Sequence, residues 1–411
     1  MELILLGLNH RIAPVQVREC LAVTPSHLPN VLRALRDVPG VAEVAVVSTC
    51  NRFEIYAATG EVASRQAALV ETLAELHGLG ACEFTCYLYT RIGADAARHL
   101  FRVAAGLDSL LIGEHQILGQ VKDAFQAAQD AGTIGDLLSG LFRQAITTGK
   151  RARTETEIGQ GARSLGQVAV SIARETFGDL TNRTALLIGV GKINKIAGRA
   201  LVESGLRWLL VANRTFERAV EVAQSLGGHA VHFDALAQGL TDADLVIVAT
   251  GAPHIVLHEN DLRDAMARRT NRLLVLIDLA VPRNVDPAVR TIPNVRLYDM
   301  DDLSAVVAAH HPIAAQAIAA AEEIVAQEVA RFLSWRRERQ TAPLIIALRS
   351  LAEEIRQAEV TKTLERLNLT PDQRQVLDSL VSSLTNKLLY ASIHAIKSTP
   401  SGHGAPIDDQ G

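Results

Sequence analysis

Aromatic residues are scarce in this sequence, and neither sign of charge dominates it. Phe, Trp and Tyr together make up 4% of the 411 residues, so aliphatic side chains must fill most of any core. The formal net charge of −4 gives no sign of general nucleic-acid binding, for which domains are usually basic. An RNA partner would have to use a local patch, for which residues 150–153 and 335–339 are candidates. Each of these basic runs can equally be a solvated helix face.

The chain also has little cysteine and no long apolar run. No apolar stretch approaches the roughly 20 residues that cross a bilayer, and the apolar start of the chain is too short for a signal peptide. We therefore expect a cytoplasmic protein with reduced thiols. Cys82 and Cys86 have no second pair of ligands nearby, so we expect no metal site and interpret both as packing residues in or beside a strand.

Two regions with different strand patterns come first along the chain. Residues 1–152 predict an α+β domain, with strands at 3–9, 41–47, 53–57 and 84–89, helices at 25–36 and 62–77, and helix through most of 94–150. Residues 153–305 alternate apolar strands with helices, which predicts a parallel, doubly wound, Rossmann-like sheet. Its expected strands are at 184–188, 208–212, 230–233, 245–249, 273–277 and 295–298.

The rest of the chain is almost wholly helical. Residues 306–397 predict long helices that break at Pro343 and Pro371. Helices of this length with no sheet to cover them usually pair with each other or with another chain. Residues 398–411 are rich in Pro, Gly and Asp and are expected to be a disordered tail.

A glycine pattern follows the first strand of the Rossmann-like region. Gly189 and Gly191 stand where a strand turns into a helix, the place at which a dinucleotide-binding loop lets its backbone approach a pyrophosphate. Asn194 occupies the third glycine position, so the helix is expected to lie slightly farther from the strand. Because a partial pattern can also be a bare turn, the alternating strands around it carry the assignment. The predicted loop consists of Gly189, Val190, Gly191, Lys192, Ile193 and Asn194.

The end of the second strand indicates which dinucleotide binds. An NAD-binding domain tends to place Asp or Glu there to hold the ribose hydroxyls, whereas this chain has Asn213, Arg214 and Thr215. Arg214 can pair with a 2′-phosphate, which favours NADPH. The alternative is an exposed arginine at a helix start, without a ligand.

Cys50 is the candidate nucleophile. It stands between Thr49 and Asn51 where a strand leaves into a loop, and the adjacent Arg52 would lower the pKa of its thiol. A thiolate attacks an acyl carbonyl and leaves a thioester, which a hydride can reduce to an aldehyde. A single cysteine is otherwise often a small buried hydrophobe, so the neighbouring dinucleotide domain is what favours the catalytic role.

Residues 106–122 carry more polar side chains than packing requires. Ser109, Glu114, Gln116 and Gln120 interrupt the apolar positions, which favours substrate recognition. His99 lies one helical stretch upstream. A single helical histidine is more often structural, so position alone does not make it catalytic.

Taken together, these motifs resemble the glutamyl-tRNA reductase family. The likeness covers the chain except for its tail. It rests on residues within 48–54, 106–122, 153–159, 189–191, 213–215, 278–287, 332–335 and 348–353.

The resemblance implies a catalytic glutamyl-tRNA-binding domain at 1–152, an NADPH-binding domain at 153–305, and a spinal helix with dimerisation helices at 306–397. It implies a homodimer that reduces glutamyl-tRNA(Glu) with NADPH to glutamate-1-semialdehyde for tetrapyrrole (porphyrin) synthesis and passes the product to an aminomutase. Cys50 would be the nucleophile and His99 an activity-linked residue. The implied substrate contacts are Thr49, Asn51, Arg52, Ser109, Glu114, His115, Gln116 and Gln120.

The sequence departs from the family pattern at three further places. His115 stands where the family usually has proline, which affects the shape of that loop. Residues 164–167 replace a serine-rich stretch near the cofactor, and the last helix lacks the usual His-Pro pair.

Three other functions remain open from the sequence. A reductase of acyl phosphates would use the same thiol and dinucleotide, but its small substrate would leave the long helices without a purpose. A nucleotide-sensing scaffold that dimerises through its helices would not need Cys50. A quinate- or shikimate-type dehydrogenase has a similar NADP domain but uses a lysine–aspartate pair in place of a Cys-Asn-Arg loop.

Overall fold

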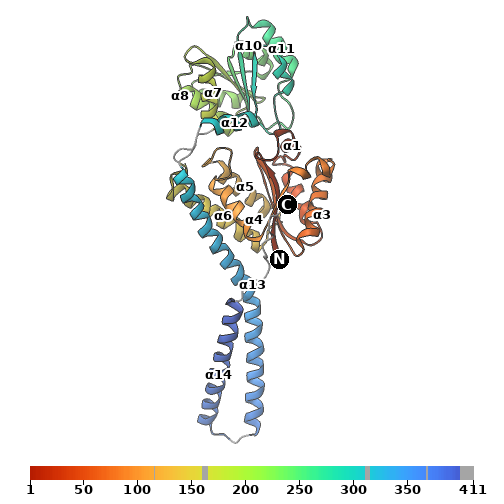
Figure 1. Ribbon diagram of the computed structural model, residues 1–411, viewed down its shortest axis with the longest axis vertical. Coiled ribbons are helices and arrows are strands. Elements are labelled where there is room, and N and C mark those ends of the chain that lie inside the picture. Colours follow the sequence, from red (N-terminus) through yellow and green to blue (C-terminus); the bar gives the residue numbers. More distant parts are fainter. Residues whose placement is uncertain (115, 160–164, 311–314, 367–368, 399–411) are drawn as a thin grey trace, which may run out of the picture. The chain divides into compact units, whose positions relative to one another are not determined.

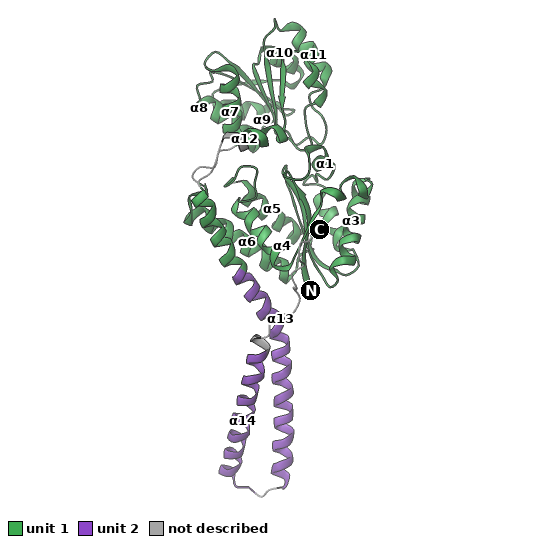
Figure 2. Cartoon of the chain, viewed as in Figure 1, with its two compact units in different colours: residues 1–329 green, residues 330–411 purple. Residues whose placement is uncertain are grey.

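The computed structural model describes residues 1–114, 116–159, 165–310, 315–366 and 369–398, which belong to two compact units (Figure 2). Unit 1 comprises residues 1–329 and unit 2 residues 330–411. Unit 1 contains both sheets of the protein's described part, and unit 2 contains helices. The predicted disordered tail lies outside the described residues, apart from Ser398 at the end of the last helix.

The four-stranded region, residues 1–155, is built on an antiparallel sheet in the order β2-β3-β1-β4. Helix α3 covers one face, and α4, α5 and α6 cover the other (Figure 1). This double cover explains why nearly every residue of β1 and β3 is buried. The elements are β1 Glu2–Asn9, α1 Val15–Cys20, α2 Leu28–Arg36, β2 Val41–Ser48, β3 Arg52–Thr59, α3 Val62–His77, β4 Tyr89–Ile92, α4 Gly93–Ala105, α5 Gln116–Asp130 and α6 Asp136–Glu155.

Residues 84–89 do not form the predicted strand. Two short 3-10 helices, Ala81–Glu83 and Thr85–Tyr87, precede β4, which pairs with β1 only from Tyr89 onward. The interpretation of Cys82 and Cys86 as packing residues was also wrong, because both are exposed. The apolar pattern of this segment was misleading because only Phe84 is buried in it.

The six-stranded region, residues 165–306, has the predicted parallel sheet, in the order β10-β9-β8-β5-β6-β7. Alternate residues face two cores: Leu187 packs with α7, α8 and α9, whereas Leu186 packs with α10 and α11. The order reverses at β5, so a crevice opens beyond its carboxyl end, where such sheets bind ligands. The elements are α7 Leu165–Phe177, β5 Thr184–Ile188, α8 Lys192–Glu203, β6 Trp208–Ala212, α9 Phe216–Leu226, β7 His229–Val231, α10 Leu236–Asp242, β8 Leu245–Val248, α11 Glu259–Arg268, β9 Leu274–Asp278, β10 Val295–Tyr298 and α12 Met300–His310.

Two long helices complete the chain, α13 Ala315–Arg366 and α14 Pro371–Ser398. The predicted break at Pro343 was wrong, since α13 runs through it. Proline in a helix interior removes one backbone hydrogen bond and costs about 3 kcal/mol, which the intact turns on both sides can offset. Within unit 2, α14 lies beside the second half of α13, and Arg356 reaches Asp378 across the pair at 2.5 Å (Figure 1). Nowhere in the described ranges does a helix combine the length and the apolar composition of a membrane span.

Candidate active site

The turn between β2 and β3 presents Cys50. Ser48 is the last residue of β2 to pair with β3, opposite Phe53. The Thr49 hydroxyl accepts hydrogen bonds from the backbone N–H groups of Asn51 and Arg52, both at 3.2 Å. Cys50 is half-buried and packs against an apolar core cluster that comes mostly from the six-stranded region and also includes Leu110 and Leu111. Thr49 therefore fixes the turn, and Cys50 contacts a core outside its own sheet.

A cavity of about 650 Å³ joins Cys50 to the glycine loop. This volume is in the range of small-molecule sites. From the four-stranded region, Cys50, Gln116 and Gln120 line it, and residues 249–251 and 279–281 line it from the six-stranded region. The predicted cofactor residues that line the cavity are Gly189, Val190, Gly191, Lys192 and Ile193. The structure thus brings the predicted nucleophile, two predicted substrate residues and the predicted loop to one place.

The glycine loop fits a dinucleotide. Gly189 has a φ of +98°, and a Cβ there would lie 2.4 Å from the Ala249 carbonyl oxygen, so only glycine is accommodated. At Gly191 the nearest atom is 3.7 Å away, which leaves the backbone accessible at the start of α8. The fully buried Asn194 donates from Nδ2 to the carbonyls of Ile188 and Gly189, at 2.7 and 2.9 Å. Its Oδ1 has no hydrogen-bond partner among the described residues.

Two arginines follow β6 at the edge of the cavity region. Arg214 is exposed just after the strand, as predicted, but it does not line the cavity. Asn213 and Arg218 do, and Arg218 lies in the first turn of α9. The sequence interpretation missed Arg218, a second cation close to the end of β6 that could have been considered together with Arg214.

The surroundings of Cys50 raise the pKa of its thiol, which contradicts the expected lowered pKa. Burial raises its pKa to about 12, and the Glu114 carboxylate adds to this shift. Arg18 and Arg52 oppose the shift, but their effects are smaller. Cys50 packs against a core cluster that comes mostly from the six-stranded region and also includes Leu110 and Leu111, and a local sequence pattern does not show this burial.

Arg52 lies in a buried polar cluster instead of a free binding position. It ion-pairs with Glu54 at 2.5 Å and with Asp108 at 3.1 Å, and its side chain is 1% exposed. His99 Nε2 lies 2.7 Å from Glu54 Oε1, which also pairs with Arg52. The Tyr89 hydroxyl donates to this same carboxylate oxygen at 2.5 Å. Burial would raise the pKa of Glu54, but Arg52 and His99 hold it well below its usual range.

Two further predicted substrate residues, Ser109 and Glu114, lie in the described part of the chain between α4 and α5. Ser109 is buried, and its hydroxyl has no hydrogen-bond partner among the described residues. Glu114 is close enough to Cys50 to affect its pKa, and burial raises the pKa of Glu114 itself. His115 lies outside the described residues. Asp108, which the sequence interpretation missed, could have been found because it precedes Ser109 in the same polar run.

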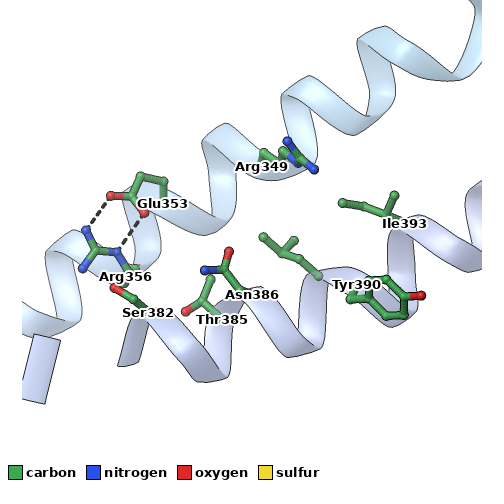
Figure 3. A pocket seen from close by; sticks show the side chains of 9 residues that line it. Arg349, Glu353, Arg356, Ser382, Thr385, Asn386, Tyr390 and Ile393 are labelled. Carbon is green, nitrogen blue, oxygen red and sulfur yellow. Dashed lines mark hydrogen bonds and ion pairs between the residues drawn. The ribbon is translucent and has the colours of Figure 1, made fainter. Parts of the chain in front are cut away.

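A second cavity lies in unit 2, between α13 and α14 (Figure 3). Glu353 and Arg356 form an ion pair of 2.6 Å at its edge. Its lining includes Ser382, Thr385 and Asn386 from α14. None of the predicted site residues line this cavity, so it is separate from the site around Cys50.

The two sheets and the shared cavity define a dinucleotide-dependent oxidoreductase with a cysteine facing its cofactor loop. Residues 6–156 match the family described as "Glutamyl-tRNAGlu reductase, N-terminal domain", and residues 320–406 its "dimerisation domain". Residues 171–306 match "Shikimate / quinate 5-dehydrogenase".

Relatives that match along nearly the whole chain are glutamyl-tRNA reductases. That of Citrifermentans bemidjiense is 39% identical over 98% of this chain and 93% of the relative, and that of Moorella thermoacetica is 42% identical over 98% and 92%. The solved glutamyl-tRNA reductase of Methanopyrus kandleri is 32% identical, covers 97% of this chain and 95% of its own, and has a TM-score of 0.51. The chain therefore belongs to the glutamyl-tRNA reductase family.

Membership confirms the predicted fold class, the oxidoreductase assignment and NADPH as the cofactor. The match to the shikimate and quinate dehydrogenases covers only the six-stranded region, whereas the flanking matches are specific to the reductase. A stand-alone dehydrogenase of that type is therefore not supported.

Proposed function

We propose that Cys50 takes the glutamyl group from glutamyl-tRNA(Glu) as a thioester, and that the enzyme reduces this group to glutamate-1-semialdehyde in the first step of tetrapyrrole synthesis. The observation that supports this most is the single cavity lined by both Cys50 and the glycine loop. Sulfur bonds to the acyl carbon, the ester C–O bond breaks, and the 3′-oxygen of the tRNA takes the thiol proton. When bound, NADPH supplies the hydride.

The residues of the site divide by the groups they would contact. We propose that the loop from Gly189 to Asn194 holds the pyrophosphate and that Arg214, with Arg218, meets the 2′-phosphate. His99 would keep the Glu54 cluster in place, since it bonds that carboxylate. Arg52 would have to exchange a partner to grip the γ-carboxylate, so this contact stays a prediction. The proposed substrate contacts are Thr49, Asn51, Arg52, Ser109, Glu114, His115, Gln116 and Gln120.

The direct test supplies the purified protein with glutamyl-tRNA and NADPH. We expect semialdehyde to form with an equal amount of free tRNA and of NADP⁺. An acyl-phosphate reductase would instead require an acyl phosphate as substrate, and a nucleotide-sensing scaffold would consume no NADPH. Failure to release tRNA from the ester would reject the proposed function.

The raised pKa of Cys50 predicts a pH dependence of thioester formation. Because the thiol is protonated below about 12, the thiolate fraction should rise with pH. The rate of tRNA release in a single turnover should therefore increase, by up to about tenfold per pH unit, between roughly pH 6.5 and 8.5. Subtraction of the release seen with Cys50→Ser corrects for ester hydrolysis in solution. If the rate of tRNA release reached a plateau near pH 7, the pKa of the reacting thiol would be far lower than the burial of Cys50 implies.

Arg214 should determine much of the preference for NADPH over NADH. A charged hydrogen bond contributes roughly 1.5–3 kcal/mol, so Arg214→Ala should weaken NADPH binding on the order of tenfold and barely change NADH binding. Titration of nicotinamide fluorescence measures both. Arg218→Ala tests the residue that lines the cavity, and Arg207→Ala, at the opposite end of β6, is the control. Equal weakening of both cofactors by Arg214→Ala would assign that residue a structural role.

We also propose that the protein is a homodimer formed through α13 and α14, because residues 320–406 match a dimerisation domain. Leu384 and Leu388 are 52% and 73% exposed on α14, one helical turn apart. Replacing both with aspartate should give a monomer in sedimentation, because a charged face cannot be buried against a second copy. Val202→Asp, on α8, should remain dimeric. An unchanged dimer in the double variant would refute this interface.

The product would pass to an aminomutase, because an amino aldehyde is reactive and benefits from direct transfer. This transient complex and the cytoplasmic location both stay predictions from the sequence. A co-sedimentation experiment with purified aminomutase, with and without glutamyl-tRNA, tests the complex.

A further inference from the structure

Helix α1 connects the Cys50 turn to the six-stranded region. Its residue Arg18 is almost fully buried, with 2% of its side chain exposed, although it lies far in sequence from both. Two further residues in the α1 segment, Val15 and Glu19, also contact the six-stranded region. Neither the dinucleotide loop nor the polar cluster around Arg52 accounts for these contacts.

Arg18 binds the nucleophile's turn and the six-stranded region at the same time. Its Nη1 group donates to the carbonyl oxygen of Cys50 at 2.5 Å and to Asn51 Oδ1 at 3.4 Å. Its Nη2 group forms an ion pair with Asp301, in the first turn of α12. The other oxygen of Asp301 accepts from the backbone N–H of Val15 at 2.8 Å. One guanidinium therefore spans the two regions that form the cavity.

A second ion pair lies next to this one. Glu19 accepts from Arg283 Nε at 2.9 Å and from its NH2 at 2.5 Å, which is a two-pronged contact. Arg283 comes two residues after Val281, and residues 279–281 line the same cavity as Cys50. Within the described residues, the hydrogen bonds and the ion pair of Glu19 go to Arg283 and not to the Cys50 turn, so the two ion pairs can be tested separately.

We propose that α1 is a latch that holds the six-stranded region over Cys50, with Arg18 as the positioning residue that ties this closure to the nucleophile's own backbone. The latch would keep in place the core cluster that Cys50 packs against, which comes mostly from the six-stranded region, and the cavity that Cys50 shares with that region. This inference rests on the proposed function, because its consequence concerns the fate of the thioester.

The latch would keep the acyl group away from water. A thioester that meets water is hydrolysed: the water oxygen bonds to the acyl carbon, the C–S bond breaks, and the sulfur recovers a proton. The products are then glutamate and the free thiol instead of the aldehyde. A released latch should therefore raise the share of glutamate without slowing the transfer from tRNA.

Three variants separate the parts of the latch. Asp301→Asn and Glu19→Gln each remove one ion pair and keep the side-chain shape. Both should release tRNA, with NADPH absent, at least as fast as the normal enzyme, because uncovering Cys50 reduces the burial that raises the pKa of its thiol. With NADPH present, the ratio of glutamate to aldehyde should rise about fivefold or more, the lower end of typical coupling between sites. The lysine in Arg18→Lys cannot reach both the Cys50 carbonyl and Asp301. This variant should therefore also release tRNA more slowly, unlike the other two variants.

Alkylation of Cys50 in the enzyme without ligands gives a readout that is independent of catalysis. Peptide mass spectrometry separates Cys50 from the three exposed cysteines. Asp301→Asn and Glu19→Gln should be alkylated at Cys50 about fivefold faster or more, because opening exposes the thiol. The control is Asp302→Asn, whose carboxylate binds Arg290 at 2.6 Å within the six-stranded region and should behave as the unchanged enzyme.

The latch is overturned if Asp301→Asn and Glu19→Gln both keep the normal alkylation rate and the normal product ratio. It is also overturned if Asp302→Asn changes both readouts as much as they do. If the unchanged enzyme forms no aldehyde, the proposed function fails, and the alkylation rates alone decide whether the latch exists.

Discussion

Replacing Cys50 with serine should lower aldehyde formation on the order of a thousandfold or more, because a hydroxyl is far less nucleophilic than a thiol. NADPH binding should be unchanged, since Cys50 contributes no group to the glycine loop. The folded structure should also survive, because the two side chains have nearly the same size. Semialdehyde production and nicotinamide fluorescence measure the two effects on the same preparation.

Cys86→Ser is the matched control for this experiment. Cys86 is exposed and lies outside the cavity, so its loss should leave the rate of aldehyde formation unchanged. Appreciable semialdehyde from Cys50→Ser would reject covalent catalysis at this residue, even if the enzyme remained a glutamyl-tRNA reductase.

Replacing Arg52 with methionine should destabilise the protein by roughly 3–5 kcal/mol, the usual cost of removing one partner of a buried ion pair. Glu54 is fully buried and Asp108 is 7% exposed, so both carboxylates would lose their main cation without gaining water. Urea unfolding at neutral pH measures the free energy of unfolding.

Arg33→Met is the control for the loss of a positive charge. Arg33 is exposed on α2 and donates to Asn30 at 3.3 Å, so its replacement should change the free energy of unfolding by less than about 0.5 kcal/mol. If Arg52→Met lost no more stability than Arg33→Met, the cluster would not be a structural ion-pair network. Arg52 would then be free to bind substrate, as the sequence suggested.

The contrast between the glycine loop and Cys50 shows what the sequence could predict. Gly189 lies at a turn from a strand into a helix that needs a backbone conformation favoured by glycine. Such a local requirement can be predicted from consecutive residues. The pKa of Cys50 depends instead on its burial against a core cluster that distant segments form, most of them in the six-stranded region. The sequence interpretation used Arg52 to lower the pKa of Cys50. In the structure Arg52 pairs with Glu54, because side chains alternate along a strand and these two residues therefore lie on the same face of β3.

Other features were missed because they join distant segments. Arg18 donates a hydrogen bond to the Cys50 carbonyl and forms an ion pair with Asp301, and no local sequence pattern predicts contacts between such distant residues. Pro343 was read as a break because proline usually ends a helix, yet the rest of α13 continues past it.

The thioester itself gives the most direct measurement of the proposed chemistry. The enzyme is mixed with glutamyl-tRNA in the absence of NADPH, quenched in acid and digested. Mass spectrometry then measures the mass of the peptide that contains Cys50. We expect one glutamyl group on that peptide, removed by hydroxylamine, and converted to semialdehyde when NADPH is added before the quench. Release of tRNA with no adduct on Cys50, or with the adduct on another residue, would contradict the proposal that Cys50 is the nucleophile.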